Sequence, residues 1–225
     1  MGPLATADLF RKIVLLTDAA RDNDHVRVYI DDNASIPDRT AAILSGGADP
    51  LPAMTDSLRK LEACGADCVI MPCNTAHYFL PRLQALTELP FVSMLEATAK
   101  ACAARFPGGT AAVLATKGTL AAGLYQAVLE REGVPFLLPD GAEQDALMRV
   151  IYDGVKAGKC PEDYRADMES VVETLAARSA DYFILGCTEL PLAAQALSLP
   201  RPTVDPTAEL AKAAIRFCGY HVKDS

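Results

Sequence analysis

The sequence predicts an α/β protein made of two similar domains, each with a parallel sheet flanked by helices. Short apolar runs alternate with segments of helical periodicity along the chain, which is typical of parallel strands joined by right-handed crossovers. One phrase also occurs twice, at residues 66–75 and 180–189: an Ala-Asp pair leads into an apolar run, and a cysteine stands seven residues after the alanine. The duplication predicts a pseudo-two-fold relation between the domains, with the active site in the cleft between them.

The first half of the chain is expected to alternate helices and strands. Helical periodicity marks residues 4–20, and an apolar run predicts a strand at 26–30. Residues 34–40 are polar and contain Pro37, so we expect a loop outside the core. A helix at 51–63 leads to the first cysteine strand, which is followed by a helix at 75–86, a strand at 91–94 and a helix at 96–106.

The second half repeats this alternation. We expect a strand at 111–115, a helix from about 116 to 133, a short strand at 136–138, helices at 142–156 and 161–178, the second cysteine strand with its helix, a brief strand at 203–204 and a last helix at 207–217. The last helix is expected to pack back on the first half. The predicted domains are therefore residues 1–98 plus 206–225, and residues 99–205.

Composition narrows the classes of function. The 225 residues are 51% hydrophobic and 22% charged, and the net charge of −8 with no basic run argues against nucleic-acid binding. No apolar run approaches the ~20 residues of a membrane span, and the N-terminal residues do not read as a signal peptide. We therefore expect no membrane association and a cytoplasmic location. Seven cysteines without a framework pattern fit reduced thiols.

Cys73 and Cys187, the cysteines of the repeated phrase, are the candidate reactive groups. Each is expected where a strand ends and a helix begins, a place where backbone N–H groups and the helix dipole lower the pKa of a thiol. A metal site is disfavoured, because Cys64, Cys68 and Cys73 are not spaced as a Cys-x-x-Cys pair. A nucleophilic Cys73 paired with His77, one helical turn later, is geometrically possible but leaves Cys187 without a role.

A two-base reaction uses both cysteines. To invert a stereocentre without a cofactor, one group removes the Cα proton from one face while another delivers a proton to the opposite face. The substrate carboxylate then gains charge and needs hydrogen-bond donors. Backbone N–H groups after the two cysteines, with the side chains of Asn74, Thr75 and Thr188, are placed to supply them, although these residues could also simply cap helices.

Two segments carry a family resemblance: Met71-Pro72-Cys73-Asn74-Thr75-Ala76-His77 and Leu185-Gly186-Cys187-Thr188-Glu189-Leu190-Pro191 closely resemble the aspartate/glutamate racemase superfamily. The loop Ile36-Pro37-Asp38-Arg39-Thr40 resembles the aspartate racemase branch in particular, as do Met1-Gly2-Pro3 and Ala115-Thr116-Lys117-Gly118-Thr119. The resemblance covers essentially the whole chain.

The resemblance implies an amino-acid racemase that needs no pyridoxal phosphate or other cofactor, with Cys73 and Cys187 as the acid/base thiols. It implies that Arg39 binds the side-chain carboxylate of a small dicarboxylic amino acid, aspartate or else glutamate, and that Lys156 is a second cation. A homodimer is also implied. The expected substrate-binding residues are Met1, Arg39, Asn74, Thr75, Thr116, Lys156, Thr188 and Glu189; no metal ligand is expected.

The sequence departs from the family pattern at its start, and several functions other than aspartate racemisation are alternatives. Family members usually carry a strand and a Gly-Gly turn before the segment that resembles Met1-Gly2-Pro3, so we expect the first sheet to lack that strand and to have unpaired edges. Glutamate or broad-specificity racemisation, hydantoin racemisation, maleate isomerisation and arylmalonate decarboxylation are alternatives within the superfamily. A dicarboxylate-binding protein without catalysis, or a thiol sensor forming a Cys73–Cys187 disulfide, is the alternative outside it. Cys64, Cys68, Cys102, Cys160 and Cys218 are expected to be apolar fillers or chance surface thiols.

Overall fold

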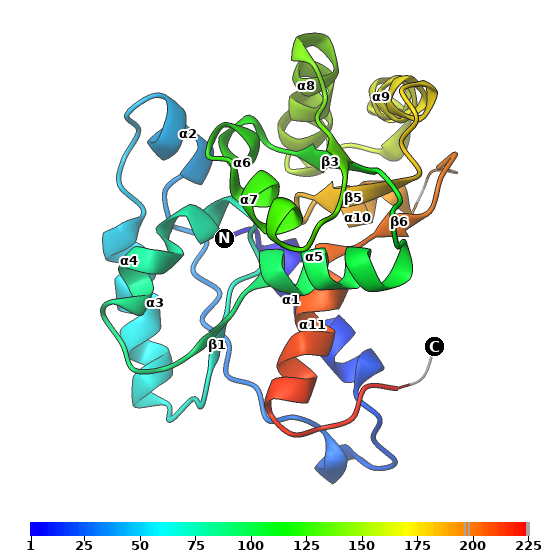
Figure 1. Ribbon diagram of the computed structural model, residues 1–225. Coiled ribbons are helices and arrows are strands. Elements are labelled where there is room, and N and C mark those ends of the chain that lie inside the picture. The colour runs from blue at the N-terminus through cyan, green and yellow to red at the C-terminus, as the bar shows by residue number, and fades with distance from the viewer. Residues whose placement is uncertain (196, 198, 224–225) are drawn as a thin grey trace. The chain divides into compact units, whose positions relative to one another are not determined.

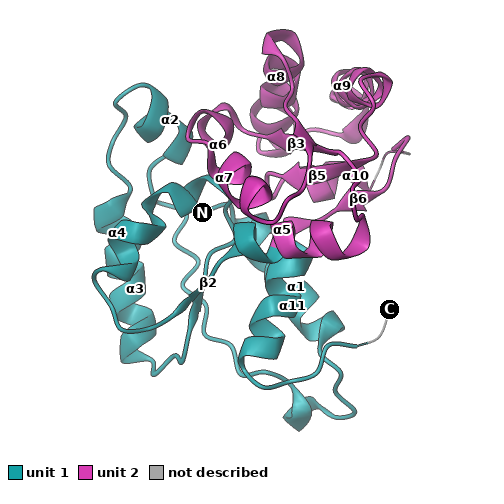
Figure 2. Cartoon of the chain, in the orientation of Figure 1, with its two compact units in different colours: residues 1–97, 207–225 teal, residues 98–206 magenta. Residues whose placement is uncertain are grey.

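The computed structural model describes residues 1–195, 197 and 199–223 (Figure 1). The chain divides into two compact units, Met1–Ala97 with Thr207–Ser225 and Thr98–Pro206 (Figure 2). The division leaves the last helix with the first half of the chain. Among the described residues, no helix is both long and apolar enough to cross a membrane.

The second unit contains a parallel sheet with the strand order β4-β3-β5-β6. The strands are β3 (Ala111–Ala115), β4 (Phe136–Leu137), β5 (Tyr182–Gly186) and β6 (Thr203–Val204). Every residue of β3 and β5 is buried, as expected for central strands covered on both faces. Ala115 is paired with Gly186, so the residues that follow these two strands, Thr116 and Cys187, come to the same carboxyl edge.

Helices and two turns connect the strands of this sheet. They are α6 (Lys117–Ala121), α7 (Leu124–Arg131), α8 (Gly141–Met148), a π-helical turn (Arg149–Val155), a 3-10 turn (Pro161–Asp163), α9 (Arg165–Ala177) and α10 (Leu190–Ala194). Helix α5 (Met94–Arg105) begins in the first unit and continues into the second. The helix predicted from 116 to 133 is two helices, because Gly123 between them adopts a left-handed conformation with φ 66°.

The first unit has a two-stranded parallel sheet, β1 (Val69–Ile70) and β2 (Phe91–Val92). Its helices are α1 (Pro3–Leu16), α2 (Arg39–Leu44), α3 (Leu51–Ala63), α4 (Leu80–Gln84) and α11 (Pro206–Phe217), with short 3-10 turns at Asp22–Asp24 and Thr75–Phe79. One apolar cluster joins α3 to β1 and the segment after it through Met54, Leu58 and Val69. A second joins α1, α11 and the start of α5 through Leu9, Ile215 and Met94.

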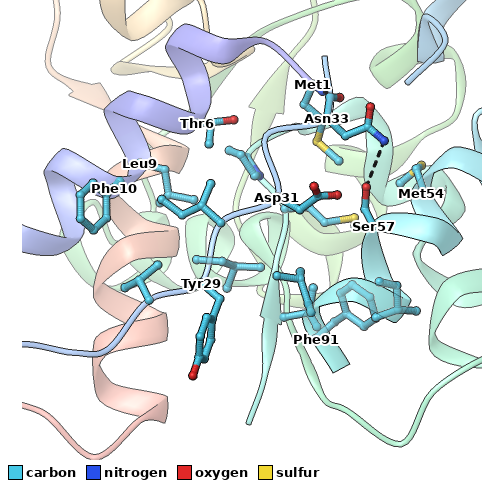
Figure 3. Close-up of a pocket in the computed structure, with 18 of the residues that line it drawn as sticks. Met1, Thr6, Leu9, Phe10, Tyr29, Asp31, Asn33, Met54, Ser57 and Phe91 are labelled. Carbon is cyan, nitrogen blue, oxygen red and sulfur yellow. Dashed lines mark hydrogen bonds between the residues drawn. The ribbon is translucent and has the colours of Figure 1, made fainter. Parts of the chain in front are cut away.

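The predicted strand at residues 26–30 is not formed. The segment is extended but pairs with no strand, and no backbone hydrogen bond joins it to another of the described residues. Between this segment and β1 lies a largely apolar cavity of about 120 Å³, lined by residues 28–31 and 69–72 and covered by side chains of α1 and α3 (Figure 3). An extended segment becomes a strand only beside a partner edge, and here the cavity occupies that place.

Candidate active site

Cys73 lies just beyond the carboxyl end of β1, in the first unit. Its N–H donates to the Met71 carbonyl at 2.8 Å, which turns the chain sharply after the strand. The segment that follows is a 3-10 turn and then the short helix α4, in place of the single helix predicted at 75–86. The thiol is partly exposed. Cys73 is therefore fixed by a tight turn at the strand end and has no long helix behind it.

The side chain of His77 holds this turn through hydrogen bonds to the backbone. Its ring is buried, Nδ1 lies 2.9 Å from the Cys73 carbonyl oxygen, and the Met94 N–H donates to Nε2 at 3.1 Å. These two contacts fit the neutral tautomer that carries its proton on Nδ1. Burial lowers the pKa of His77 to about 4, against an ordinary value of 6.5. Because both ring nitrogens are engaged by backbone groups, His77 is not placed as a base for the Cys73 thiol.

Arg39 is buried, against the prediction that residues 34–40 form a loop outside the core. It is the first residue of α2, whose start is capped by Asp38 accepting from the Ala41 N–H. Arg39 Nη1 donates to the carbonyls of Ile36 at 2.9 Å and Pro37 at 2.8 Å. The guanidinium is thus held by its own loop.

Met1 lies near both Arg39 and Cys73. Its amine donates to the Asn33 carbonyl, and its side chain, like that of Cys73, packs against the apolar cluster that contains Ile36. Burial, and then the positive charge of Arg39, lower the pKa of the Met1 amine, whereas Cys73 acts in the opposite direction. Three residues predicted for the site from distant parts of the sequence therefore share one region of the first unit.

Asn74 and Thr75 complete the predicted set in this unit. Both are buried, Asn74 at 2% and Thr75 at 5% exposure. Asn74 precedes the 3-10 turn without capping it through its side chain, and its carbonyl accepts from the His77 N–H. Their position directly after the thiol is the one that the sequence predicted for substrate-binding groups.

Cys187 lies one residue after β5, at the carboxyl edge of the four-stranded sheet in the second unit. The strand reaches this point only because residue 186 is glycine: a Cβ there would lie 2.9 Å from Tyr125 Cε2 and 3.0 Å from the Leu114 carbonyl oxygen. Tyr125 is fully buried. The sequence shows a glycine before the cysteine, but no pattern in it identifies Tyr125 as the residue that packs there.

Glu189 is bonded to the second thiol. Cys187 Sγ donates to Glu189 Oε2 at 3.0 Å, and Thr188 Oγ1 donates to the same oxygen at 3.1 Å. All three residues are buried. A carboxylate that accepts a hydrogen bond from the thiol stabilises the protonated form over the thiolate. The sequence predicted Glu189 as a substrate-binding residue, whereas its contacts in this structure are to the thiol and its neighbour.

Thr116 and Lys156 differ in their placement. Thr116 is buried and caps α6, since its Oγ1 accepts from the Thr119 N–H at 3.3 Å, and it follows the strand that pairs with the one before Cys187. Lys156 is exposed at the end of the π-helical turn, with Nζ 4.1 Å from the ring centroid of Tyr152.

Within the described part of the chain, no group of three or more His, Cys, Asp or Glu side chains is arranged to hold a metal ion.

Comparison with known proteins gives a consistent picture. The model of the Asp/Glu/hydantoin racemase family matches residues 1–214. The broad-specificity amino-acid racemase RacX of Bacillus subtilis is 27% identical over 221 residues, which cover 96% of this chain and 93% of that protein. The glutamate racemase of Deinococcus radiodurans is 33% identical over 141 residues, 61% of this chain. The match covers 47% of that longer protein.

Solved structures of similar proteins share the fold. The aspartate racemase of Picrophilus torridus superposes with a TM-score of 0.86 at 29% identity, covering 99% of this chain and 92% of that one. An aspartate racemase homologue from Pyrococcus horikoshii gives a TM-score of 0.75 at 21% identity, covering 96% and 95%. At the lower identity the likeness establishes the fold alone.

Proposed function

The chain belongs to the Asp/Glu/hydantoin racemase family, and on that premise we propose that it interconverts L- and D-aspartate without pyridoxal phosphate, with Cys73 and Cys187 as the two acid/base groups. The observation that carries the proposal is the equivalent placement of the thiols: each stands just beyond the carboxyl end of a parallel strand in its own unit. That edge is where open α/β sheets bind ligands. The proposal requires the two thiols to face one Cα atom from opposite sides.

The environments of the two thiols suggest how the proton moves. Glu189 holds the proton on Cys187, which favours the thiol form there and suits Cys187 to the acid role in the resting enzyme. Cys73, as thiolate, then removes the Cα proton, and Cys187 delivers its own proton to the opposite face. After one turnover the protonation states are exchanged, and they return to the resting state through solvent. The same two residues catalyse the reverse reaction with their roles exchanged.

The substrate would be held by charge and by backbone donors. Arg39, already oriented by the carbonyls of its loop, is proposed to bind the side-chain carboxylate through its guanidinium. The α-carboxylate, which gains charge as the proton leaves, would be stabilised by the groups that follow the cysteines: Asn74, Thr75 and Thr188, with Thr116 at the same edge as Cys187. Met1 would line the site beside Arg39, and Lys156 would contribute a second positive charge.

A broader substrate range is the second candidate, because RacX, described as a broad-specificity amino-acid racemase, matches this chain over nearly its whole length. Aspartate and glutamate differ by one methylene, which a pocket discriminates by only ~1–3 kcal/mol. The buried Arg39 favours dicarboxylic over monocarboxylic substrates. Comparing kcat/KM for aspartate, glutamate and neutral amino acids of similar size decides between the two candidates.

The test of racemisation is proton NMR in D2O with no pyridoxal phosphate added. The proposal expects loss of the Cα proton signal of L-aspartate together with the appearance of D-aspartate. Cys73→Ser and Cys187→Ser should each abolish racemisation while retaining the folded state, and Cys160→Ser, at an exposed position, serves as the control. Ligand-dependent thermal stabilisation without any exchange would indicate a binding protein instead. Racemisation at the wild-type rate in either serine variant would exclude the two-base mechanism.

Assembly is a separate part of the proposal. We expect a homodimer, and sedimentation equilibrium at several protein concentrations tests this directly. A single species of monomer mass at concentrations used for activity would contradict it.

A further inference from the structure

Two cysteines outside the candidate active site lie side by side. Cys68 directly precedes β1, and Cys218 follows the last residue of α11, yet their sulfur atoms are 4.0 Å apart across 150 residues of sequence. Both belong to the first unit. No pattern in the sequence associates these two residues, and each was expected to be an apolar filler or a chance surface thiol.

The packing of the first unit enforces this proximity. Ile70, two residues after Cys68, packs against the core cluster that contains Ile215, three residues before Cys218. The end of α11 is itself closed by hydrogen bonds, from the Cys218 N–H to the Ala214 carbonyl and from the Gly219 N–H to the Arg216 carbonyl. Both cysteines are therefore attached to ordered backbone on either side of one core, and both are accessible: Cys68 is partly exposed and Cys218 is exposed.

We propose that Cys68 and Cys218 are a modification site, a dithiol that closes reversibly to an intramolecular disulfide when the protein meets a disulfide oxidant of the glutathione type. A disulfide needs the sulfurs at about 2.05 Å, so the 4.0 Å gap between the two sulfur atoms must close by roughly 2 Å. The proposed racemisation uses neither of these two residues.

The two thiols have different parts in the reaction. Cys218 is exposed whereas Cys68 is only partly exposed, and burial, followed by the neighbouring Cys218, raises the pKa of Cys68; Cys218 is therefore the first nucleophile. The Cys218 thiolate attacks oxidised glutathione, forming a mixed disulfide and releasing one glutathione thiolate. The Cys68 sulfur, after losing its proton to solvent, then attacks the Cys218 sulfur and expels the second. In sum, two protein thiols and one glutathione disulfide become one protein disulfide and two glutathione molecules.

The bond would connect the start of β1 to the end of α11. Because it closes a loop of about 150 residues, it constrains the unfolded chain strongly. The oxidised protein should therefore unfold at a higher temperature, by roughly 5–15 °C for a protein of this size. Reduction with dithiothreitol should return the unfolding temperature to its original value.

The test is equilibration of the whole protein in a series of oxidised and reduced glutathione mixtures, followed by acid quenching, alkylation and peptide mass spectrometry without reduction. The expected result is a Cys68–Cys218 peptide pair as the main intramolecular disulfide, with the rise in unfolding temperature. Cys64→Ser, which removes an exposed thiol four residues before Cys68, should leave both unchanged. Cys68→Ser should trap Cys218 as its glutathione mixed disulfide, whereas Cys218→Ser should leave Cys68 slow to react. A wild-type protein that accumulates only mixed disulfides, or links other cysteines instead, overturns the proposal.

Discussion

Replacing His77 by glutamine is expected to flatten the acid side of the dependence of stability on pH. In the folded protein the ring is buried between the Cys73 carbonyl and the Met94 N–H, and burial lowers the pKa of His77 from 6.5 to about 4. The unfolded chain therefore binds a proton at a higher pH than the folded chain does. Stability contributed by this residue is complete above pH 6.5 and is lost as the pH falls from 6.5 towards 4.

The magnitude follows from the two pKa values. The full difference corresponds to roughly 3 kcal/mol of unfolding free energy at pH 4 and below, and about 2 kcal/mol of it is lost by pH 5. The assay is urea unfolding of wild type and His77→Gln at pH 7.5 and pH 5.0. The wild type should lose about 2 kcal/mol more than the variant between these conditions, because the other titrating groups are common to both proteins.

Two controls make the test specific. His221→Gln, at an exposed position, should lose as much stability as the wild type over the same pH range. An NMR titration of the imidazole signals in the wild-type protein should show His77 still neutral at pH 5, and this measurement does not depend on the stability of the variant. A His77 signal that titrates near pH 6.5 in the folded protein would refute the reasoning.

The remaining predictions concern the two cysteine regions. Gly186→Ala places a Cβ against Tyr125 and the Leu114 carbonyl and should cost about 1–3 kcal/mol of unfolding free energy in urea titrations. Gly141→Ala, where a Cβ meets nothing within 4 Å, should cost almost nothing, and equal effects of the two substitutions would contradict the packing argument. Glu189→Gln removes the charge beside the Cys187 thiol, so alkylation of Cys187 followed by mass spectrometry should reach half its maximal rate at a lower pH than in wild type; an unchanged profile would mean that Glu189 does not hold the proton. Arg39→Lys loses the planar fork and the paired bonds to its loop carbonyls, so KM for aspartate should rise by roughly 10–100-fold with a smaller change in kcat, and an unchanged KM would remove Arg39 from the binding site.

The local elements were largely predictable from the sequence. The helix Leu51–Ala63 and the strand Ala111–Ala115 have the predicted bounds, because a strong helical period and a fully apolar run each leave little choice to the backbone. The segment at 26–30 shows the limit of such predictions. It has the apolar residues of a strand, but strand formation also requires a neighbouring edge, and that edge is not a property of the segment itself.

The candidate site, like the fold, was predictable from the sequence only in part. The duplicated phrase alone was enough to select Cys73 and Cys187 as candidates, since it places both thiols beyond the ends of apolar strands. The partners of these thiols were not visible in the sequence. That His77 binds the backbone at Cys73 rather than its thiol, and that Glu189 accepts from Cys187, depend on side-chain directions set by packing. The burial of Arg39 and its bonds to the carbonyls of Ile36 and Pro37 likewise depend on how the preceding loop folds.

The sequence by itself determined the alternation of strands and helices, the membership of a racemase family and the two thiols that are candidates for its chemistry. These features are encoded in short segments, where the period of apolar residues and the order of a few side chains are sufficient. Only the tertiary structure decided which groups surround those thiols, that residues 26–30 join no sheet, and that Cys68 lies 4.0 Å from Cys218. Each of these depends on contacts between residues far apart in the chain, and such contacts exist only after the core has packed.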